Sequence, residues 1–434
     1  MLLEFSVKNY RSIKDKVTLS MVASSDNEHP ENVFEVNKPS HFRLLKSVGI
    51  YGANASGKSN VLRALGFIEE LVRESATGMA PGDEIDVTPF KLDPVAREQP
   101  SEFEVSFIAE GERYVYGFAV DRQRVHEEWL TAARTSRSRA LFHRHEDGTV
   151  EFGPSWRGER ARLVEHTRTN ALLLSVAAQF NSADVRPPHN WFSGQLQDSR
   201  VPSGLSAYRM LTMVVLTADP EAQSDLVRFL QAADLGIEQV EPVRIDVDSH
   251  PAYRTLTRAE RKEVASVGLP AGVGLEDILA RASTFRRASD GGAIRLDLDD
   301  DESAGARRLF EMAGPFRAAA GSQNLLVVDE LEASLHPAIT RYLLEQQHHT
   351  DSHSQLLFAT HDCGLLDADL LRRDQVWFTE RDSEGATQLY SLWDFRPRKD
   401  ENYRKGYLQG RYGAVPFVGE FTFGEDKETE RSED

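Results

Sequence analysis

The 434-residue sequence predicts an α/β protein in which a parallel core sheet is accompanied by an antiparallel β-subdomain. Apolar runs at 47–51, 324–328 and 355–359 have the length and composition of strands that are buried on both faces, as in a parallel sheet. Alternating apolar and polar residues at 103–107 and 114–120 are instead typical of strands with one buried face. Because both patterns occur in one chain, we expect two sheets.

Turn-forming residues and a change in the spacing of apolar residues divide the chain further. Glu110-Gly111 and Asp147-Gly148 each separate two strand-like segments and predict hairpins in the β-subdomain. From about 160 to 287 the apolar spacing becomes helical, and Ile294–Leu298 has the form of a strand that returns to the core. The expected parts are the N-terminal half of the core with the β-subdomain (1–158), a helical insertion (159–290), the C-terminal half of the core (291–395) and a C-terminal tail (396–434).

The most informative motif is a complete G-x-x-x-x-G-K-S loop between the first core strand and a helix. A Gly-rich turn at a helix N-terminus directs backbone N–H groups at a phosphate. In such a loop the lysine reaches the β- and γ-phosphates and the serine hydroxyl binds Mg²⁺. The strand–helix frame favours this interpretation over a chance Gly/Ser loop. We therefore expect ATP and Mg²⁺ as ligands, with ATP bound by Gly52, Ala53, Asn54, Ala55, Ser56, Gly57, Lys58, Ser59 and Asn60.

The apolar run at 324–328 ends in two carboxylates, Asp329 and Glu330. At the tip of a buried parallel strand, both would enter a site. Phosphoryl transfer needs mainly positioning and charge neutralisation. We expect Asp329 to hold Mg²⁺ together with Ser59, and Glu330 to orient and deprotonate the attacking water.

The order of motifs resembles the ATPase heads of the RecF/SMC/OLD-like ABC class. Leu331–Pro337 matches their dimer-contacting loop, which implies subunit contacts for Ser334 and His336. His361, at the tip of the strand 355–359, resembles their switch histidine at the γ-phosphate, although a lone histidine is more often structural. The resemblance implies an ABC-type P-loop ATPase head, split by the helical insertion, that forms a homodimer or higher homo-oligomer through an ATP sandwich.

The segment 301–310 lies where these heads carry their signature sequence, about twenty residues before the acidic strand. Glu302, Ser303 and Gly305 form a divergent version of L-S-G-G-Q, and Ala306 replaces an expected threonine. A serine hydroxyl and a glycine N–H at a helix N-terminus suit the γ-phosphate of a nucleotide held by another subunit. Taken alone, the segment would be only a helix N-cap; its place in the series favours the signature.

The N-terminus resembles the opening strand and turn of the same heads. Arg11 in this turn is a candidate phosphate or ribose contact, with a surface arginine as the alternative. The glutamine that such heads carry in their Q-loop is not located, and Gln99 is the nearest candidate.

Composition indicates a soluble cytoplasmic enzyme. No run of about eighteen apolar residues predicts a membrane span, and the charged N-terminus does not resemble a signal peptide. The one cysteine, Cys363, suits a reducing compartment and is expected in the core rather than on a metal. The net charge of −18 weighs against a general nucleic-acid surface, and the arginine clusters at 134–144, 157–162 and 254–262 are expected to be solvated faces. The charged segment 425–434 is expected to be disordered.

The phrase Y-L-x-G-R-Y-G-A-x-P at 407–416 looks like the bacterial RloA/AbiL-type family of standalone ABC-ATPases, which resembles the ATPase subunit of PARIS-type phage defence. This implies an ATP-hydrolysing sensor and scaffold of a two-component abortive-infection system, which controls a separately encoded effector of RloB or Toprim nuclease type and responds to a phage trigger. The insertion lacks the sustained heptads of SMC proteins, and the segment after His361 is too short for a nuclease domain. The alternative is a RecF-like repair ATPase that acts directly on DNA; direct nucleic-acid binding stays open. An ABC transporter subunit is a more distant alternative.

Overall fold

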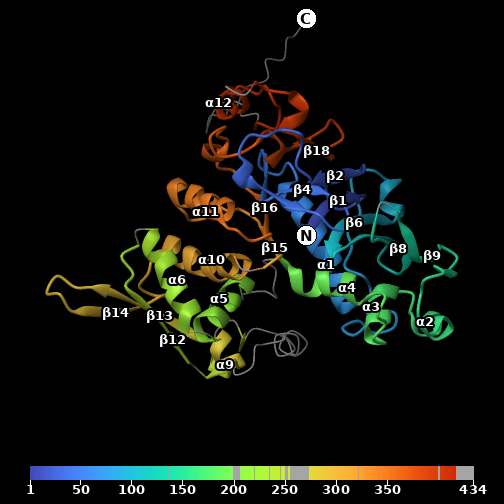
Figure 1. Cartoon of the computed structure of the whole chain (residues 1–434), viewed down its shortest axis with the longest axis horizontal. Coiled ribbons are helices and arrows are strands. Elements are labelled where there is room, and N and C mark those ends of the chain that lie inside the picture. Colours follow the sequence, from blue (N-terminus) through green and yellow to red (C-terminus); the bar gives the residue numbers. More distant parts are fainter. Residues whose placement is uncertain are drawn as a thin grey trace, which may run out of the picture.

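The computed structural model describes residues 1–135, 137–198, 206–218, 220–233, 235–244, 246–249, 253–254, 273–320, 322–398 and 401–416. Two large sheets lie side by side, and a smaller third sheet projects from the opposite side of the molecule (Figure 1). Within these residues, no helix is both long and apolar enough to cross a membrane.

The core sheet has the order β11-β15-β16-β5-β17-β18, and only its last pair is antiparallel. Its central strands are fully buried, as the continuous apolar runs predict. The predicted parallel core is therefore confirmed. Its strands are β5 (Ser47–Gly52), β11 (Leu196–Asp198), β15 (Leu325–Val328), β16 (Gln355–Ala359), β17 (Val376–Arg381) and β18 (Thr387–Ser391).

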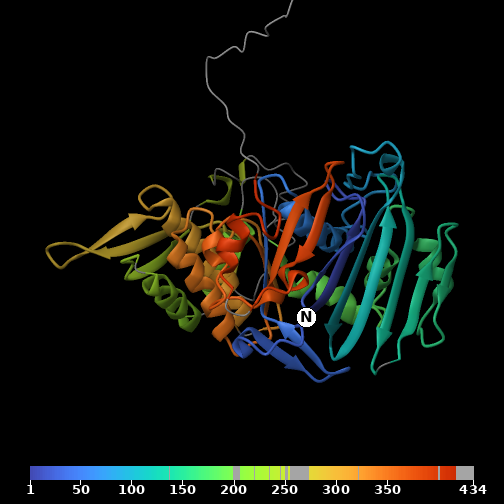
Figure 2. The same cartoon turned by 90° about the horizontal axis from the view of Figure 1, so that it is seen from above.

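The second sheet is antiparallel, with the order β10-β9-β8-β7-β6-β1-β2, and Figure 2 shows its long strands at one end of the molecule. Both predicted hairpins occur, with Ala109 opposite Glu112 and Arg144 opposite Val150. The strands are β1 (Leu2–Lys8), β2 (Val17–Ser20), β6 (Ser101–Ala109), β7 (Glu112–Val120), β8 (Val125–Ala133), β9 (Arg139–Arg144) and β10 (Val150–Phe152).

Helix α1 (Lys58–Glu74) joins the two sheets through one hydrophobic cluster. Phe67 on this helix lies 4.9 Å from Phe103 and 6.4 Å from Phe118, measured between ring centroids. Such aromatic pairs add to the stabilisation that burial of their area gives. The β-subdomain thus holds the helix that begins at the Gly-rich loop.

The expected helical insertion is helical only in part. Helices α2 (Arg160–His166), α3 (Leu173–Gln179) and α4 (Arg186–Asn190) pack with the β-subdomain rather than apart from it. Glu128 of β8 is fully buried and accepts hydrogen bonds from the backbone N–H groups of Leu173 and Leu174, at 2.6 and 2.9 Å. This part of the insertion therefore shares the first hydrophobic core.

The rest of the insertion packs on the C-terminal half of the core. Helices α5 (Ala207–Ala218) and α6 (Pro220–Ala232) contact α10 (Ala304–Ala320), and the short helix α9 (Leu275–Ile278) contacts α5. Gly314 permits the close crossing of α5 and α10, since a Cβ there would lie 2.4 Å from the Cα of Thr212.

Strand β11 and two strands of the third sheet, β12 and β13, lie within the segment 159–290, where only helices were expected. Besides β11, which joins the core sheet, β12 (Gln239–Val243), β13 (Arg281–Arg287) and β14 (Ala293–Asp297) form the projecting antiparallel sheet. The predicted return strand is β14, which pairs with β13 and is followed by α10. β12 has one buried residue and β14 has none, whereas β13 has three consecutive buried residues, so the apolar alternation that reveals a half-buried strand is weak in all three.

The C-terminal segment packs on the core as far as the structure describes it. Tyr407 and Tyr412 stack on Phe378 of β17 at 5.5 and 5.9 Å. The charged segment 425–434 lies outside the described residues, as does most of the basic cluster at 254–262. The remaining elements are β3 (Val33–Val36), β4 (Phe42–Leu45), α11 (Pro337–His349) and α12 (Tyr403–Leu408).

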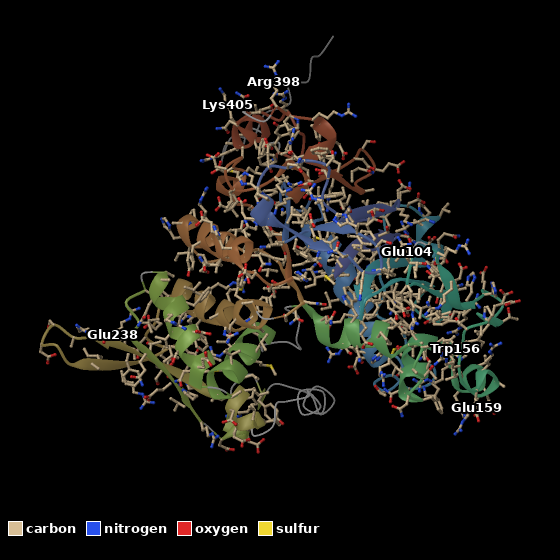
Figure 3. The ribbon with its side chains drawn as sticks, viewed as in Figure 1. Glu104, Trp156, Glu159, Glu238, Arg398 and Lys405 are labelled. Carbon is tan, nitrogen blue, oxygen red and sulfur yellow. The ribbon has the colours of Figure 1, made fainter. Side chains whose placement is uncertain are left out.

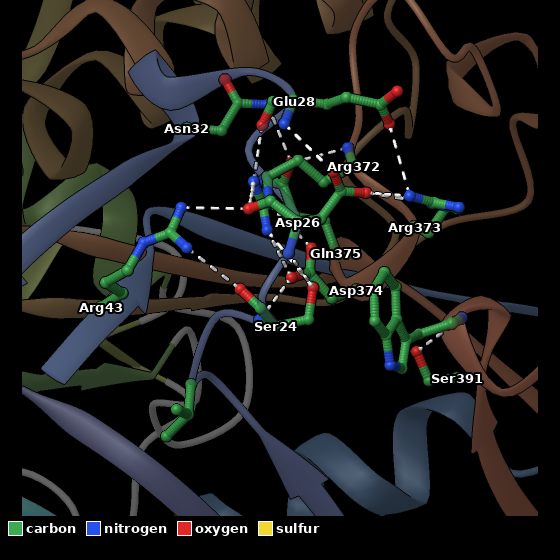
Figure 4. A network of polar contacts seen from close by, with 12 residues as sticks. Ser24, Asp26, Glu28, Asn32, Arg43, Arg372, Arg373, Asp374, Gln375 and Ser391 are labelled. Carbon is green, nitrogen blue, oxygen red and sulfur yellow. Dashed lines mark hydrogen bonds and ion pairs between the residues drawn. The ribbon is translucent and has the colours of Figure 1, made fainter. Parts of the chain in front are cut away.

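A buried polar network fastens the N-terminal segment to the end of the core sheet (Figure 4). Arg372 is fully buried and donates two hydrogen bonds to Asp374, at 2.9 and 2.7 Å, and others to the carbonyls of Asp26 and Glu28. The backbone N–H of Ser24 also donates to Asp374, at 2.7 Å. Because each charge is paired and bonded, the network ties residues 24–28 to the start of β17.

Candidate ATP site

The expected site residues meet at one edge of the core sheet. Strands β15, β16 and β5 are parallel neighbours in that order, so their C-terminal ends lie side by side. The Gly-rich loop follows β5, Asp329 and Glu330 follow β15, and His361 follows β16. Ligands of open α/β sheets bind at this edge.

The two motif glycines are required by close contacts. Gly57 has a φ of 113°, and a Cβ there would lie 2.1 Å from the hydroxyl oxygen of Thr387. At Gly52 a Cβ would lie 2.4 Å from the carbonyl oxygen of Thr379. Two threonine hydroxyls also hold the loop: Thr379 contacts the Ser56 hydroxyl at 2.6 Å, and Thr387 donates to the Ser56 carbonyl at 2.8 Å. Neither threonine was predicted, because no sequence motif marks Thr379 or Thr387.

Lys58 is buried beneath the loop with 5% of its surface exposed. Its ammonium donates to the carbonyls of Gly52 and Ala53, at 2.8 and 3.1 Å. Burial lowers the pKa of this ammonium, and the Asp329, Glu332 and Glu330 carboxylates counteract that shift. A positive charge at this place suits a phosphate.

The N-terminus of α1 also fits a phosphate. Across the part of the chain that the structure describes, the backbone N–H groups of Gly57, Lys58 and Ser59 have no hydrogen-bond acceptor. Free N–H groups at the start of a long helix form an anion site. The residues present therefore fit the phosphates of a nucleoside triphosphate.

A hard cation fits beside the loop. The Ser59 hydroxyl lies 3.1 Å from Asp329 Oδ1, so α1 and β15 bring a hydroxyl and a carboxylate to one point. Mg²⁺ prefers oxygen ligands of this kind together with substrate phosphates. Ser59 and Asp329 would hold it, and the ion would supply charge neutralisation at the phosphates.

Glu330 lies on a strained turn directly after Asp329. It is exposed and has a left-handed backbone with a φ of 51°. A non-glycine residue in this region costs about 1–3 kcal/mol, and such residues concentrate at active sites. The geometry is that of a carboxylate presented to a ligand rather than one that packs in the core.

Glu332 links the Glu330 turn to the tip of β16. Its carboxylate accepts hydrogen bonds from the Thr360 hydroxyl and from the backbone N–H of His361, both at 2.6 Å. The exposed His361 has its Nδ1 atom 3.4 Å from the Lys58 ammonium. The histidine thus lies against the phosphate loop, and Glu332 is a positioning residue that the sequence did not reveal.

The signature residues lie on another surface. Ser303 is exposed and caps α10, since its hydroxyl accepts from the N–H of Ala306 at 3.1 Å. Glu302 is buried and bound to Arg286 and Thr284, so its carboxylate is already engaged within the chain. Its observed contacts are those of a residue that fixes the loop.

The expected dimer loop adjoins the signature. A Cβ on Gly305 would lie 2.8 Å from the Ser334 carbonyl. Ser334 is exposed, with a φ of 61°, and His336 caps α11 by accepting from the N–H of Ala338 at 3.2 Å. Among the described contacts, no hydrogen bond joins Ser303 or Gly305 to the phosphate loop of the same chain.

The N-terminal turn reaches the loop through Ser12 rather than Arg11. The Ser12 hydroxyl accepts from the Asn60 amide at 2.7 Å and lies 2.8 Å from the Thr387 hydroxyl. Arg11 is half-buried, and its guanidinium donates to the Tyr10 hydroxyl at 3.1 Å. Asn60 therefore contacts the N-terminal turn, and Arg11 is one residue from a group that touches the site.

The backbone places another glutamine near this edge. Gln99 lies between the strands of the β-subdomain, and its carbonyl accepts from Asn9 at 2.8 Å. Gln197, by contrast, lies near the C-terminal end of β11, which is parallel to β15.

The sheet order, the phosphate loop and the acidic strand define an ATPase of the P-loop class with an ABC-type head. The chain belongs to the family described as "AAA domain, putative AbiEii toxin, Type IV TA system", whose model matches residues 47–367. No curated protein shows significant similarity to it.

Solved structures with remote similarity are heads of SMC proteins. An SMC head bound to the C-winged helix domain of ScpA is 13% identical, with a TM-score of 0.41, over 90% of this chain and 97% of the other. The SMC head domain from Thermotoga maritima is 11% identical, with a TM-score of 0.41, over 90% and 98%. An SMC head from Pyrococcus furiosus with an extended coiled coil, bound to the C-terminal domain of ScpA, is 12% identical, with a TM-score of 0.34, over 91% and 99%.

Proposed function

We propose that this protein is the ATP-hydrolysing sensor and scaffold of a two-component bacterial defence system that acts by abortive infection. It would control a separately encoded effector, a nuclease of RloB or Toprim type, in response to a phage trigger. The family match, whose description names an AbiEii toxin and a type IV toxin–antitoxin system, supports a role of this kind. In this proposal the chain acts in the cytoplasm and the effector carries the lethal activity.

The observation that carries the ATPase part is the meeting of Lys58, Ser59 and Asp329 beneath one loop. Mg²⁺-dependent hydrolysis follows from this arrangement, with Glu330 as the group that orients and deprotonates water. His361 would contact the γ-phosphate, since it already lies beside Lys58.

A two-subunit site follows from the surface that carries Ser303 and Ser334. Both residues are exposed and adjacent, and they have no contact with the phosphate loop of their own chain within the described structure. In a head-to-tail sandwich, Ser303 and Gly305 would donate to the γ-phosphate held by the other subunit. Nucleotide state would then set subunit geometry, and a coupling of 1–3 kcal/mol would be enough to change effector affinity 5- to 150-fold.

The test is restriction of phage in cells. We expect protection only when the protein is expressed together with the gene that neighbours its own, and loss of protection with Glu330→Gln. Glu384→Gln is a matched control, because Glu384 is an exposed carboxylate that pairs with Lys14 rather than with a residue of the loop. Protection by this chain alone would contradict the two-component proposal, and tight ATP-dependent binding to DNA ends would favour a repair ATPase.

A further inference from the structure

The projecting sheet ends in an edge strand, β14. Proteins usually protect such a strand from pairing with another chain. Its order is β12-β13-β14, and Figures 1 and 2 show the β13–β14 hairpin extending away from the body. Figure 3 locates Glu238, beside β12, at the opposite side of the molecule from Trp156 and Glu159. Ile294 of β14 is 50% exposed, which is unusual for a large apolar side chain on an edge strand.

The hydrogen bonds at both ends of the β13–β14 pair show which backbone groups of β14 point away from β13. The N–H of Ala288 donates to the Gly292 carbonyl at 2.7 Å, and the N–H of Leu298 donates to the Ala282 carbonyl at 2.9 Å. In an antiparallel pair, bonded residues recur at every second position. The even-numbered residues of β14 therefore bond to β13, and the odd-numbered residues direct their N–H and C=O groups outward.

Two of these outward residues have backbone groups without a hydrogen-bond partner in the described structure. The N–H of Asp297 donates to Asp301 Oδ2 at 2.8 Å, which closes that end of the strand. Ala293 and Arg295 have no such partner in the described structure, and the Arg295 side chain turns back to donate to the Ser283 hydroxyl at 3.0 Å. We call the outward backbone groups of Ala293 and Arg295 the open edge.

The other edge of the same sheet is protected. On β12, Pro242 has no N–H to offer. The carbonyl of Val240 accepts from the Gln223 side chain of α6 at 3.1 Å. One edge is therefore blocked by proline and by a helix, whereas the open edge keeps its pairing capacity.

The open edge is complementary to itself. If two β14 strands pair antiparallel about a two-fold axis at Ile294, Ala293 of each copy lies opposite Arg295 of the other. The two N–H and two C=O groups on each strand then match, and the exposed Ile294 side chains face each other in a non-bonded pair, whose Cα atoms lie about 4.5 Å apart. We propose that β14 pairs with β14 of a second copy of this chain, in a closed contact separate from the ATP sandwich.

Disulfide trapping tests the register directly. Cys363 is the only cysteine, so Cys363→Ser provides a cysteine-free background, and Lys58→Ala in the same chain removes nucleotide-driven association. Ile294→Cys would place one thiol opposite its copy, at a separation that a disulfide can bridge. We expect mild oxidation to convert most of this protein into a covalent dimer.

Ala293→Cys in the same background is the matched control, because its copy lies diagonally across the axis. We expect little covalent dimer from it. Equal trapping at the two positions, or none at Ile294→Cys, would overturn the proposed pairing.

Arg295→Pro gives a second measurement without cysteine. The substitution removes one outward N–H of the backbone, and proline is accepted on edge strands in that orientation. It also removes the side-chain bond to Ser283, which Arg295→Ala removes as well. We expect the wild-type protein to sediment as a dimer without nucleotide, and Arg295→Pro to sediment as a monomer with an unchanged thermal melt, while Arg295→Ala stays dimeric. A monomeric wild-type protein, or a dimeric Arg295→Pro protein, would contradict the proposal, as would pairing of β14 with a strand of a different protein.

Discussion

The phosphate loop and the signature surface (Ser303, Gly305 and Ser334) belong to the proposed ATPase site, but they differ in their contacts within the chain. Around the loop, Ser56 and Ser59 contact Thr379 and Asp329 from distant segments of the same chain, and Lys58 donates to the Gly52 carbonyl at the end of β5. On the signature surface, Ser303 and Ser334 are exposed, and the hydrogen bonds observed for Ser303 are to its own helix, α10. One half-site is built by intrachain contacts, and the other is presented outward. This difference supports the proposal that the chain prepares nucleotide binding by itself and that a second subunit completes the catalytic site.

The largest effect should come from the catalytic carboxylate at the border of the two surfaces. Glu330→Gln would keep ATP binding, because the loop and Asp329 are untouched, and would lower the rate of hydrolysis about 10²–10⁴-fold, since a neutral amide cannot take the proton from water. Steady-state phosphate release and nucleotide binding measure the two quantities. A wild-type rate in this variant would remove Glu330 from the mechanism.

Mixing two inactive variants tests whether the surfaces complete each other. Lys58→Ala disables the loop and Ser303→Arg blocks the signature, so each pure protein should be inactive. In a random 1:1 mixture half of the dimers are mixed and each has one intact site, which predicts recovery of about one quarter of the wild-type rate. No recovery, with mixed dimers shown by cross-linking, would mean that the site is complete within one chain.

Acid should lower the free energy of unfolding through a buried histidine, His348. It lies beside Ser47, at the end of β5 opposite the phosphate loop. His348 is 2% exposed and lies 2.8 Å from the Ser47 hydroxyl, and burial lowers its pKa to about 3. In the unfolded chain its pKa is about 6.5, so below that pH the unfolded state binds the proton and the folded state does not. Stability is therefore fully present above pH 6.5 and falls as the pH drops toward 3, by about 2 kcal/mol at pH 5.

Urea unfolding between pH 7 and 5 measures this loss. His348→Gln keeps an amide for the Ser47 hydroxyl but does not titrate, so its stability should change less over the same interval. An equal slope in the two proteins would assign the acid sensitivity to other groups.

The smallest effect concerns the support beneath the loop. Thr387→Val keeps the shape of the side chain but removes the hydrogen bond to the Ser56 carbonyl. A typical bond of this kind contributes about 1 kcal/mol, so ATP should bind about fivefold more weakly. Thr149→Val, in an exposed turn of the β-subdomain, is the control and should bind ATP as the wild type does. Calorimetric titration would distinguish the two.

What the sequence could predict was local in the chain. The loop at 52–59 and the pair Asp329-Glu330 each carry their chemistry in consecutive residues, and the strands beside them are marked by continuous apolar runs. Fold class and phosphate loop were therefore open to prediction.

What the sequence could not predict depends on contacts between distant segments. Thr379, Thr387 and Glu332 support the site only because β17, β18 and β16 lie beside the loop, and a threonine in a strand carries no local mark of that role. Glu302 was assigned to the signature from its neighbours in sequence, but its carboxylate is bound to Arg286 of β13, a strand that lay within the segment expected to be helical. Strands β12 and β13 were not predicted because their residues show little alternation of apolar and polar side chains.

The arrangement of β5 has a consequence for synthesis. This strand is made early, yet its two neighbours, β16 and β17, begin at Gln355 and Val376, more than three hundred residues later. On the ribosome, the phosphate loop must therefore wait, unpaired, until most of the chain has emerged. A nascent or truncated chain that ends before β17 would carry the whole Gly-rich motif and still lack the strands that shape it. A nucleotide-competent molecule would thus require translation through β17 and β18, the strands that carry Thr379 and Thr387.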